Sequence, residues 1–292
     1  MKKLLLLFCL GLFVSCGDSG SADNLSPTSD TTGPSLEEIL DSQTDAMKKR
    51  YEFRRPQETL ELFGIKPGMT VVEALPGGGW YTKLLTPLLG SEGTIVGANY
   101  PMGIWSLFGY KGERLDNMTS WPTSWPSEIN EKSATNGGAN AQAFMFGELP
   151  ISMHGSADAV LLIRALHNLA RFESQGGFLT SSIQNTYDIL KPGGIVGVVQ
   201  HQARDNMPDE WANGSNGYLK KSFVIDLMTE AGFELVTDSD INLNEKDQPT
   251  AEDIVWRLPP SLATSKDNEE LKSSMISIGE SNRMTLKFKK PA

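Results

Sequence analysis

Short apolar segments recur along the chain and are separated by polar or amphipathic segments. Four of the apolar segments are nearly continuous and rich in valine, isoleucine and leucine: residues 69–75, 93–100, 156–166 and 193–201. Runs of this kind are typical of strands buried on both faces of a parallel sheet. Three more segments are predicted as strands, the first of them a weaker candidate and the last with alternating polarity: residues 141–146, 233–240 and 284–291.

Amphipathic patterns between the apolar segments predict helices. Ser35 is followed three residues later by Glu38, which is the spacing of a capping box, so a helix is predicted over residues 35–53. Three further helices are predicted: residues 56–64, 177–190 and 222–232. The alternation of strands and helices predicts a doubly wound α/β domain.

Two regions interrupt the alternation, residues 101–140 and 242–279, and both are interpreted as extended insertions. The first is rich in Trp, Pro, Asn and Gly. Its residues Trp105, Trp121 and Trp125 are candidates either for an apolar lid over a bound ligand or for core packing.

The N-terminal segment has the features of an export signal. Lys2 and Lys3 precede an apolar stretch, residues 4–14, that is too short to span a bilayer. Residues 13–16, Phe-Val-Ser-Cys, resemble a bacterial lipobox, in which the cysteine is lipidated. We therefore expect a lipoprotein signal peptide over residues 1–16, a flexible linker over 17–34 and a folded domain over 35–292, held at the cell envelope (periplasmic or extracellular face) through lipidated Cys16. A secreted protein without a lipid anchor is the alternative.

Composition narrows the classes of function. The formal net charge is -10, and removal of Lys2 and Lys3 makes it -12, which argues against binding to nucleic acid or to anionic lipid. Cys9 and Cys16 are the two cysteines of the chain, so the predicted domain has no disulfide, cysteine nucleophile or thiolate metal site.

A glycine-rich segment follows the first predicted strand. The strand carries Glu73, and residues 76–79 are Pro-Gly-Gly-Gly before an apolar, helix-like stretch. A strand, a glycine turn and a helix N-terminus are the usual elements of a nucleotide-binding crevice, because glycine lets the backbone approach a ligand. Neither G-x-G-x-x-G nor a phosphate-binding P-loop motif is present. A tight turn without a ligand is the alternative interpretation.

The segment resembles motif I of class I S-adenosylmethionine-dependent methyltransferases, and in particular a bacterial group of predicted methyltransferases with the motif E-x-x-PGGGWYT. Residues 158–168, 189–203, 231–247 and 278–291 resemble later segments of that group, in the same order. The resemblance implies a Rossmann-like doubly wound sheet of the class I methyltransferase type, with strand order 3-2-1-4-5-7-6, N-terminal helices and loop insertions.

The resemblance also implies a cofactor, S-adenosylmethionine, and a set of residues that bind it: Glu73, Pro76, Gly77, Gly78, Gly79, Trp80, Tyr81, Asn99 and Glu148. Two positions depart from the common pattern of the superfamily. Leu75 and Pro76 occupy the first half of the glycine loop. Asn99 stands where a carboxylate usually accepts hydrogen bonds from both ribose hydroxyls, and an amide has a single accepting oxygen.

Candidate catalytic residues follow the fourth and fifth strands. His167 comes just after the fourth strand and His201 ends the fifth, so both are expected at the carboxyl edge of the sheet. A histidine is suited to remove a proton from a methyl acceptor, and Arg164 lies three residues before His167. Strand capping is the alternative role of each histidine. A metal site built from the two histidines with Asp158 or Asp205 is a further alternative, but we predict no metal.

Together these features predict an exported, lipid-anchored S-adenosylmethionine-dependent methyltransferase acting on a small molecule or an envelope component. The alternative is a non-catalytic ligand-binding or scaffold protein that re-uses the fold, since S-adenosylmethionine is made in the cytoplasm. A nicotinamide oxidoreductase is disfavoured because G-x-G-x-x-G is missing.

Overall fold

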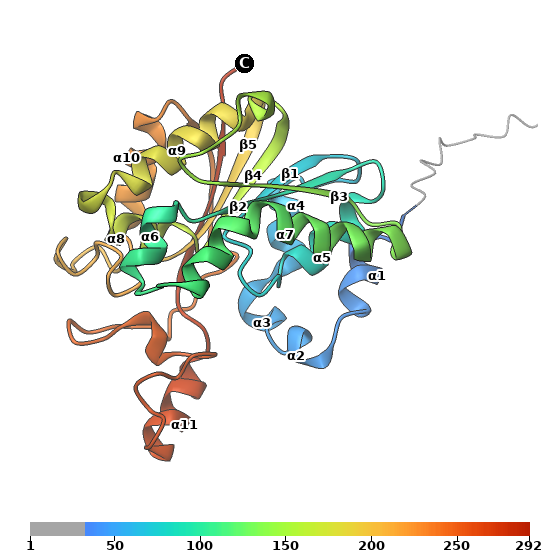
Figure 1. Ribbon diagram of the computed structural model, residues 1–292. Helices are drawn as coiled ribbons and strands as arrows, with labels where there is room; N and C mark the ends of the chain where they lie inside the picture. Colours follow the sequence, from blue (N-terminus) through green and yellow to red (C-terminus); the bar gives the residue numbers. More distant parts are fainter. Residues whose placement is uncertain (1–32) are drawn as a thin grey trace, which may run out of the picture. The chain divides into compact units, whose positions relative to one another are not determined.

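A seven-stranded sheet organises the domain, and helices pack on both of its faces (Figure 1). The computed structural model describes residues 33–292, which form one compact unit. The strands are β1 (Thr70–Ala74), β2 (Thr94–Asn99), β3 (Asn140–Met145), β4 (Ala157–Ile163), β5 (Leu190–His201), β6 (Glu234–Ser239) and β7 (Arg283–Lys289). Their order is β3-β2-β1-β4-β5-β7-β6. The first five are parallel, and β7 is antiparallel to both β5 and β6.

The predicted fold class and strand order are confirmed. Every segment predicted as a strand forms one, including the weaker candidate at residues 141–146. β5 begins earlier than predicted, at Leu190, because residues 190–194 pair with the start of β4 and with the last residues of the chain. The antiparallel direction of β7 matters for the site, since it pairs Arg283, the first residue of β7, with His201, the last residue of β5.

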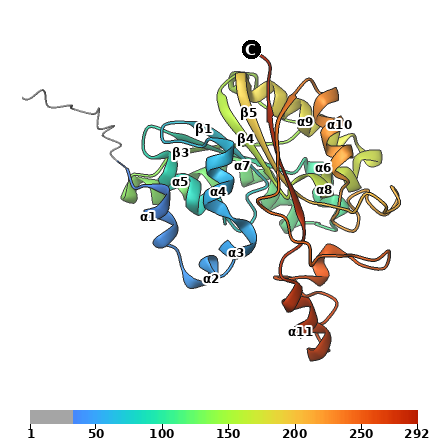
Figure 2. The ribbon, with the colours of Figure 1, turned by 180° about the vertical axis from the view of Figure 1, so that it is seen from behind.

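The helices form two layers (Figures 1 and 2). One layer shares a core with one face of the sheet and contains α1 (Leu36–Asp41), α4 (Pro56–Phe63), α5 (Thr82–Leu89) and α7 (Glu113–Asn136). The other layer contains α6 (Met102–Leu107), α8 (Leu166–Arg171), α9 (Phe178–Ile189) and α10 (Lys221–Glu230). Short 3-10 turns are η1 (Ile151–Met153), η2 (Glu173–Gln175) and η3 (Val255–Arg257). The helices predicted at residues 56–64, 177–190 and 222–232 are confirmed as α4, α9 and α10.

The helix predicted over residues 35–53 is divided into three. These are α1, α2 (Asp45–Lys48) and α3 (Tyr51–Arg54). The capping box at Ser35 is present, but α1 ends at Asp41 and is followed by Ser42, whose hydroxyl donates to the carbonyl of Ile39 (2.8 Å). Hydroxyl side chains that bond to the backbone compete with helix continuation, which explains the break within the Ser-Gln-Thr segment.

The interpretation of residues 101–140 as an extended insertion is wrong, because most of this region forms α6 and the long helix α7. α7 contains Pro122 and Pro126, which disfavour a helix interior. Its buried side chains Trp125, Ile129 and Ser133 are spaced four residues apart, so they share one helix face. Packing of this face against the sheet outweighs the cost of the prolines.

Residues 242–279 form the second predicted insertion, and part of it is the helix α11 (Glu269–Ile278), which was not predicted. Both ribbon views show α11 apart from the sheet, and it buries none of its residues (Figures 1 and 2). The rest is anchored by buried Asp247, which accepts hydrogen bonds from the Tyr218 hydroxyl (3.0 Å) and Arg257 Nη2 (2.9 Å). This anchor holds residues 255–261 at the edge of the sheet where the parallel strands end.

The predictions on residues 1–16 and on most of the linker, including Cys16, lie outside the described residues. Among residues 33–292, no helix is long and apolar enough to cross a membrane.

Candidate functional site

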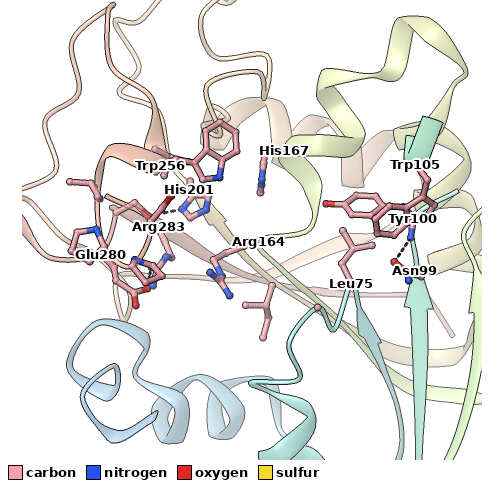
Figure 3. Close-up of a pocket in the computed structure, with 18 of the residues that line it drawn as sticks. Leu75, Asn99, Tyr100, Trp105, Arg164, His167, His201, Trp256, Glu280 and Arg283 are labelled. Atoms are coloured by element: carbon pink, nitrogen blue, oxygen red, sulfur yellow. Dashed lines mark hydrogen bonds and ion pairs between the residues drawn. The ribbon is translucent and has the colours of Figure 1, made fainter. Parts of the chain in front are cut away.

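A cavity of about 510 Å³ lies at the carboxyl edge of the sheet, where β1, β2, β4 and β5 end and β7 begins. Figure 3 shows four residues on one side, Leu75 after β1, Asn99 at the end of β2, Tyr100 after it and Trp105 in α6. Residues near β5 and β7 lie on the other side. Arg164 and His167 lie between the two sides. The volume is in the range of about 300–1,000 Å³ that is usual for ligand pockets.

The adjacent strands β1 and β4 end at the cavity, and each is followed by a residue with a left-handed backbone conformation. Leu75 follows β1 with φ of 54°, and Arg164 follows β4 with φ of 58°. The amide of Leu75 donates to the carbonyl of Ala98 (2.7 Å), and the amide of Arg164 donates to Val199 (2.6 Å). A left-handed conformation is costly for residues other than glycine and is concentrated at functional sites. Both residues line the cavity.

The glycine loop lies beside Leu75, and Gly77 lines the cavity. Gly77 has φ of 53°, and the amide of Gly79 donates to the carbonyl of Pro76, which is buried (2.9 Å). Among the described residues, no backbone or side-chain group accepts from the amides of Gly77 and Gly78. A side chain at Gly78 would meet nothing within 4 Å. The loop therefore offers free donors beside open space.

Glu73, Trp80 and Tyr81 support the loop from behind and do not line the cavity. Buried Glu73 accepts a hydrogen bond from the Thr82 hydroxyl (2.6 Å), which links β1 to the first turn of α5. Burial raises the pKa of Glu73 to about 7, and the bond from Thr82 partly offsets this. The Trp80 ring packs edge-to-face on Tyr81 and carries the guanidinium of Arg54 at 4.5 Å.

Asn99 ends β2 and lines the cavity, as predicted from its position. Its Oδ1 already accepts from the amide of Tyr100 (2.8 Å), so the Nδ2 donor is the group that remains for a ligand. Tyr100 and Trp105 pack edge-to-face and form an aromatic wall. Glu148 is exposed after β3 and lies outside the cavity, so its predicted contact with a cofactor stays a prediction.

The tryptophans of residues 101–140 were candidates for an apolar lid or for core packing, and they differ in position. Trp105 and Trp121 line the cavity, whereas Trp125 is buried and stacks on Trp121. Both α7 indoles lie over Gly97 in β2.

His167 and His201 come together at the cavity, as predicted from their places after β4 and at the end of β5. Their ring centroids are 5.4 Å apart, and Trp256 packs edge-to-face on His167. His201 Nδ1 is 2.5 Å from the Ser281 hydroxyl, and no described residue bonds to buried His167 Nδ1.

Both histidines are neutral at pH 7. Burial lowers the pKa of His167 to about 4 and that of His201 well below its usual range. The positive charges of Arg164 and Arg283 lower the pKa of His201 further. A histidine in this state can donate or accept a hydrogen bond, but it is a weaker base than one with an unperturbed pKa.

The cavity residues that were not predicted as site residues include Trp256, Glu280, Ser281 and Arg283. The last three precede or begin β7, whose antiparallel pairing with β5 carries them to the edge where His201 lies. The strand order implied by the resemblance places the seventh strand beside the fifth, which was the available signal, but it gives neither the direction nor the register of the pairing. Trp256 comes from the anchored insertion and had no comparable signal.

The alternative metal site is not assembled. Asp158 lies at the start of β4, the opposite end from His167, where it accepts from the Thr70 amide (2.8 Å) and pairs with Lys191 (2.5 Å). Asp205 and His154 are exposed and do not line the cavity. Within residues 33–292 there is no group of three or more His, Cys, Asp or Glu side chains arranged to hold a metal ion.

Comparison with known proteins finds similarity in structure and none in sequence: no family model and no curated protein matches. The structure of the [4+2]-cyclase SpnF matches with a TM-score of 0.52 and 14% identity, over 82% of this chain and 81% of that one. A SAM dependent methyltransferase from Aquifex aeolicus has a TM-score of 0.46 and 16% identity, over 72% of this chain and 94% of that one. An arsenic (III) S-adenosylmethionine methyltransferase from Chlamydomonas reinhardtii has a TM-score of 0.44 and 13% identity, over 89% of this chain and 74% of that one.

At these identities the similarity concerns the fold. With the strand order β3-β2-β1-β4-β5-β7-β6, the chain has the Rossmann-like fold of the class I methyltransferase type, which supports more than one activity.

Proposed function

We propose that the protein is an S-adenosylmethionine-dependent methyltransferase. The observation that carries the proposal is the cavity that joins the glycine loop to the end of β2, where free amides, an amide side chain and an aromatic wall converge. Gly77 and Gly78 supply backbone donors, Asn99 supplies Nδ2, and Tyr100 with Trp105 supplies a flat apolar surface for a nucleoside. The residues present therefore fit the cofactor. S-adenosylmethionine, when bound, supplies a methyl group on a positively charged sulfur.

The chain's own residues would bind and orient the reactants. Gly77, Asn99 and Tyr100 would hold the nucleoside over β1 and β2, and Glu73 would act through Thr82 by fixing the loop. The acceptor would lie over β4, β5 and β7, in contact with His167, His201 and Arg164. Because both histidines are neutral, they are available to accept a proton or a hydrogen bond from the acceptor.

Calorimetric titration of the described unit, residues 33–292, with S-adenosylmethionine and S-adenosylhomocysteine tests this proposal. We expect saturable binding of both, and a loss of at least about tenfold in affinity for Gly78→Val, because the new side chain occupies the open space beside the free amides. Gly33→Val is the matched control, since a side chain there also meets nothing within 4 Å. Absence of binding to the unmodified protein would refute the cofactor assignment.

We also propose that the protein is exported and held at the cell envelope by lipidated Cys16, on the basis of the N-terminal sequence. In bacterial cells fed a labelled fatty acid, the protein should carry the label and sediment with membranes. Cys16→Ser should abolish both, whereas Cys9→Ser should change neither. A labelled Cys16→Ser protein would refute lipidation at this residue.

A non-catalytic ligand-binding protein is the second candidate function. The observation that favours it is the low pKa of both histidines, which leaves the cavity without a strong base. The two functions differ in one measurement, the appearance of S-adenosylhomocysteine when the protein is incubated with S-adenosylmethionine and a mixture of acceptors. A ligand that co-purifies with the protein, with no such product, would favour the binding protein.

A further inference from the structure

Three arginines pair with a single carboxylate at one end of the cavity, and a fourth arginine lies beside them. Arg50, Arg54 and Arg283 all form ion pairs with Glu280, and Arg164 lies next to them. The group therefore carries an excess of three positive charges, although the chain as a whole has a net charge of -10. We refer to these five residues as the arginine cluster.

Three members of the cluster, Arg54, Glu280 and Arg283, are buried, and some of the hydrogen-bond donors of the arginines have no partner. Arg54 and Arg283 are 4% and 3% exposed, and within the described part of the chain Arg54 Nη1 and Arg283 Nε have no hydrogen-bond partner. Arg164 is half-buried, and its side chain forms no ion pair or hydrogen bond with residues 33–292. Buried charge without a counter-charge is expensive, so an uncompensated cluster of this kind indicates a place for an anion.

Three members of the cluster line the cavity, the guanidinium groups of Arg164 and Arg283 and the carboxylate of Glu280. His167, His201 and Trp256 line it beside them, whereas Arg50 and Arg54 do not. Guanidinium groups bind carboxylate and phosphate oxygens in a bidentate manner, which selects these groups over other acceptors. Figure 3 shows Arg283 on the side opposite to Asn99 and Tyr100, so the cluster is distinct from the proposed nucleoside half.

We propose that the arginine cluster is an anion subsite that holds the carboxylate or phosphate group of the methyl acceptor, so that the acceptor is an anionic small molecule. The proposal rests on the proposed function only in calling the bound molecule an acceptor. S-adenosylmethionine contains a carboxylate of its own, which is the rival occupant. It also carries a net positive charge, which the cluster repels unless a second, anionic molecule is bound there.

Histidine NMR signals provide a direct assay that does not depend on catalysis. The chain has three histidines, of which His167 and His201 line the cavity and His154 is exposed elsewhere. Titration with inorganic phosphate, and separately with acetate, should shift the signals of His167 and His201 saturably and leave that of His154 unchanged. Absence of a saturable shift with both anions would overturn the proposal.

Three variants test whether the shift of the histidine NMR signals depends on the arginine cluster. Arg164→Gln removes a charge that has no ion-pair partner, so it should preserve folding and weaken anion binding by about tenfold or more. Arg283→Gln should have a similar effect, with folding checked by the methyl region of the same spectrum. Arg55→Gln is the control, because Arg55 is exposed and adjacent in sequence to Arg54. Equal anion affinity in the wild type and in Arg164→Gln would overturn the proposal.

A further experiment tests whether the cluster binds the anionic group of the acceptor or the carboxylate of the cofactor. With S-adenosylhomocysteine at saturation, phosphate or acetate should still bind and still depend on Arg164. Two results together would show that the cluster holds the carboxylate of the cofactor and that the proposal is wrong. The first is that saturation with S-adenosylhomocysteine abolishes anion binding. The second is that Arg164→Gln lowers the affinity for S-adenosylhomocysteine but not for methylthioadenosine, which lacks the carboxylate. If S-adenosylhomocysteine does not bind, the methyltransferase proposal fails while the anion subsite is still decided by the first titration.

Discussion

Glu73 shows how a single residue can link the glycine loop to pH. Its side chain is 5% exposed, and burial raises its pKa from 4.5 to about 7. Below pH 4.5 the folded and unfolded states are both protonated at this residue. As the pH rises from 4.5 to about 7, the unfolded state ionises first, so the folded state loses stability, by roughly 3 kcal/mol in total.

We therefore expect Glu73→Gln to remove this part of the pH dependence. Urea unfolding of the wild type and the variant should be compared at pH 5 and pH 8. The free energy of unfolding of the wild type relative to the variant should fall by roughly 2.5 kcal/mol between these two pH values. Glu61→Gln, at an exposed position of α4, is the control. A difference that does not change with pH would show that Glu73 is ionised in the folded protein throughout.

Leu75 and Arg164 illustrate a second feature at the scale of residues. Each occupies a left-handed conformation directly after a buried strand, and each faces the cavity. Nothing in the residue type predicts this, because leucine and arginine avoid that conformation. The strain is imposed by the hydrogen bonds to Ala98 and Val199 on neighbouring strands.

At the scale of elements, α7 depends on a glycine in the strand beneath it. A Cβ at Gly97 would lie 2.8 Å from Trp121 and 2.9 Å from Trp125, so both indoles require the space that glycine leaves. We expect Gly97→Ala to destabilise the protein by about 1–3 kcal/mol, the usual cost of overpacking a core. Urea unfolding measures the loss, and near-ultraviolet circular dichroism should report the altered stack of the two indoles.

Gly78→Ala serves as the comparison for this prediction, since a Cβ there meets nothing within 4 Å. Its stability should stay within about 0.5 kcal/mol of the wild type. If both alanine variants are equally stable, α7 is free to move away from β2 and the packing argument fails.

At the scale of the whole molecule, Glu280 ties the N-terminal helices to the last strand. It receives Arg50 and Arg54 from the region of α3 and Arg283 from β7. Burial alone would raise the pKa of Glu280, but Arg283, Arg54 and Arg50 outweigh it and lower the pKa to about 2. The carboxylate is therefore ionised over the physiological range and is the counter-charge for arginines that are distant in sequence.

Glu280→Gln should destabilise the protein by about 3–5 kcal/mol, because it leaves buried guanidinium groups without a counter-charge. Glu269→Gln, exposed on α11, should have little effect. Phosphate should restore part of the loss in Glu280→Gln if the cluster binds anions, since a ligand stabilises the state that binds it. Equal stability of Glu280→Gln and the wild type would contradict this prediction, because it would show that water solvates the guanidinium groups when the carboxylate is removed.

The arrangement of the site was predictable where it depends on the ends of parallel strands. His167, His201, Arg164 and Asn99 each follow or end an apolar segment, and the carboxyl ends of parallel strands share one edge. Arg283 and Glu280 were not predicted as site residues, because their position depends on the register of an antiparallel strand. Trp80 and Tyr81 follow the glycines directly in sequence, yet they turn into the core and contact the loop from behind.

The strands, most of the helices and, through the resemblance of the glycine segment, the order of the sheet were predictable from the amino-acid sequence. These depend on periodicity and motifs, which are properties of neighbouring residues. Three features came from packing alone: α7 is a helix, both histidines are buried and neutral, and three arginines pair with one carboxylate. Burial and the meeting of charges up to 230 residues apart arise from packing, so no local pattern records them.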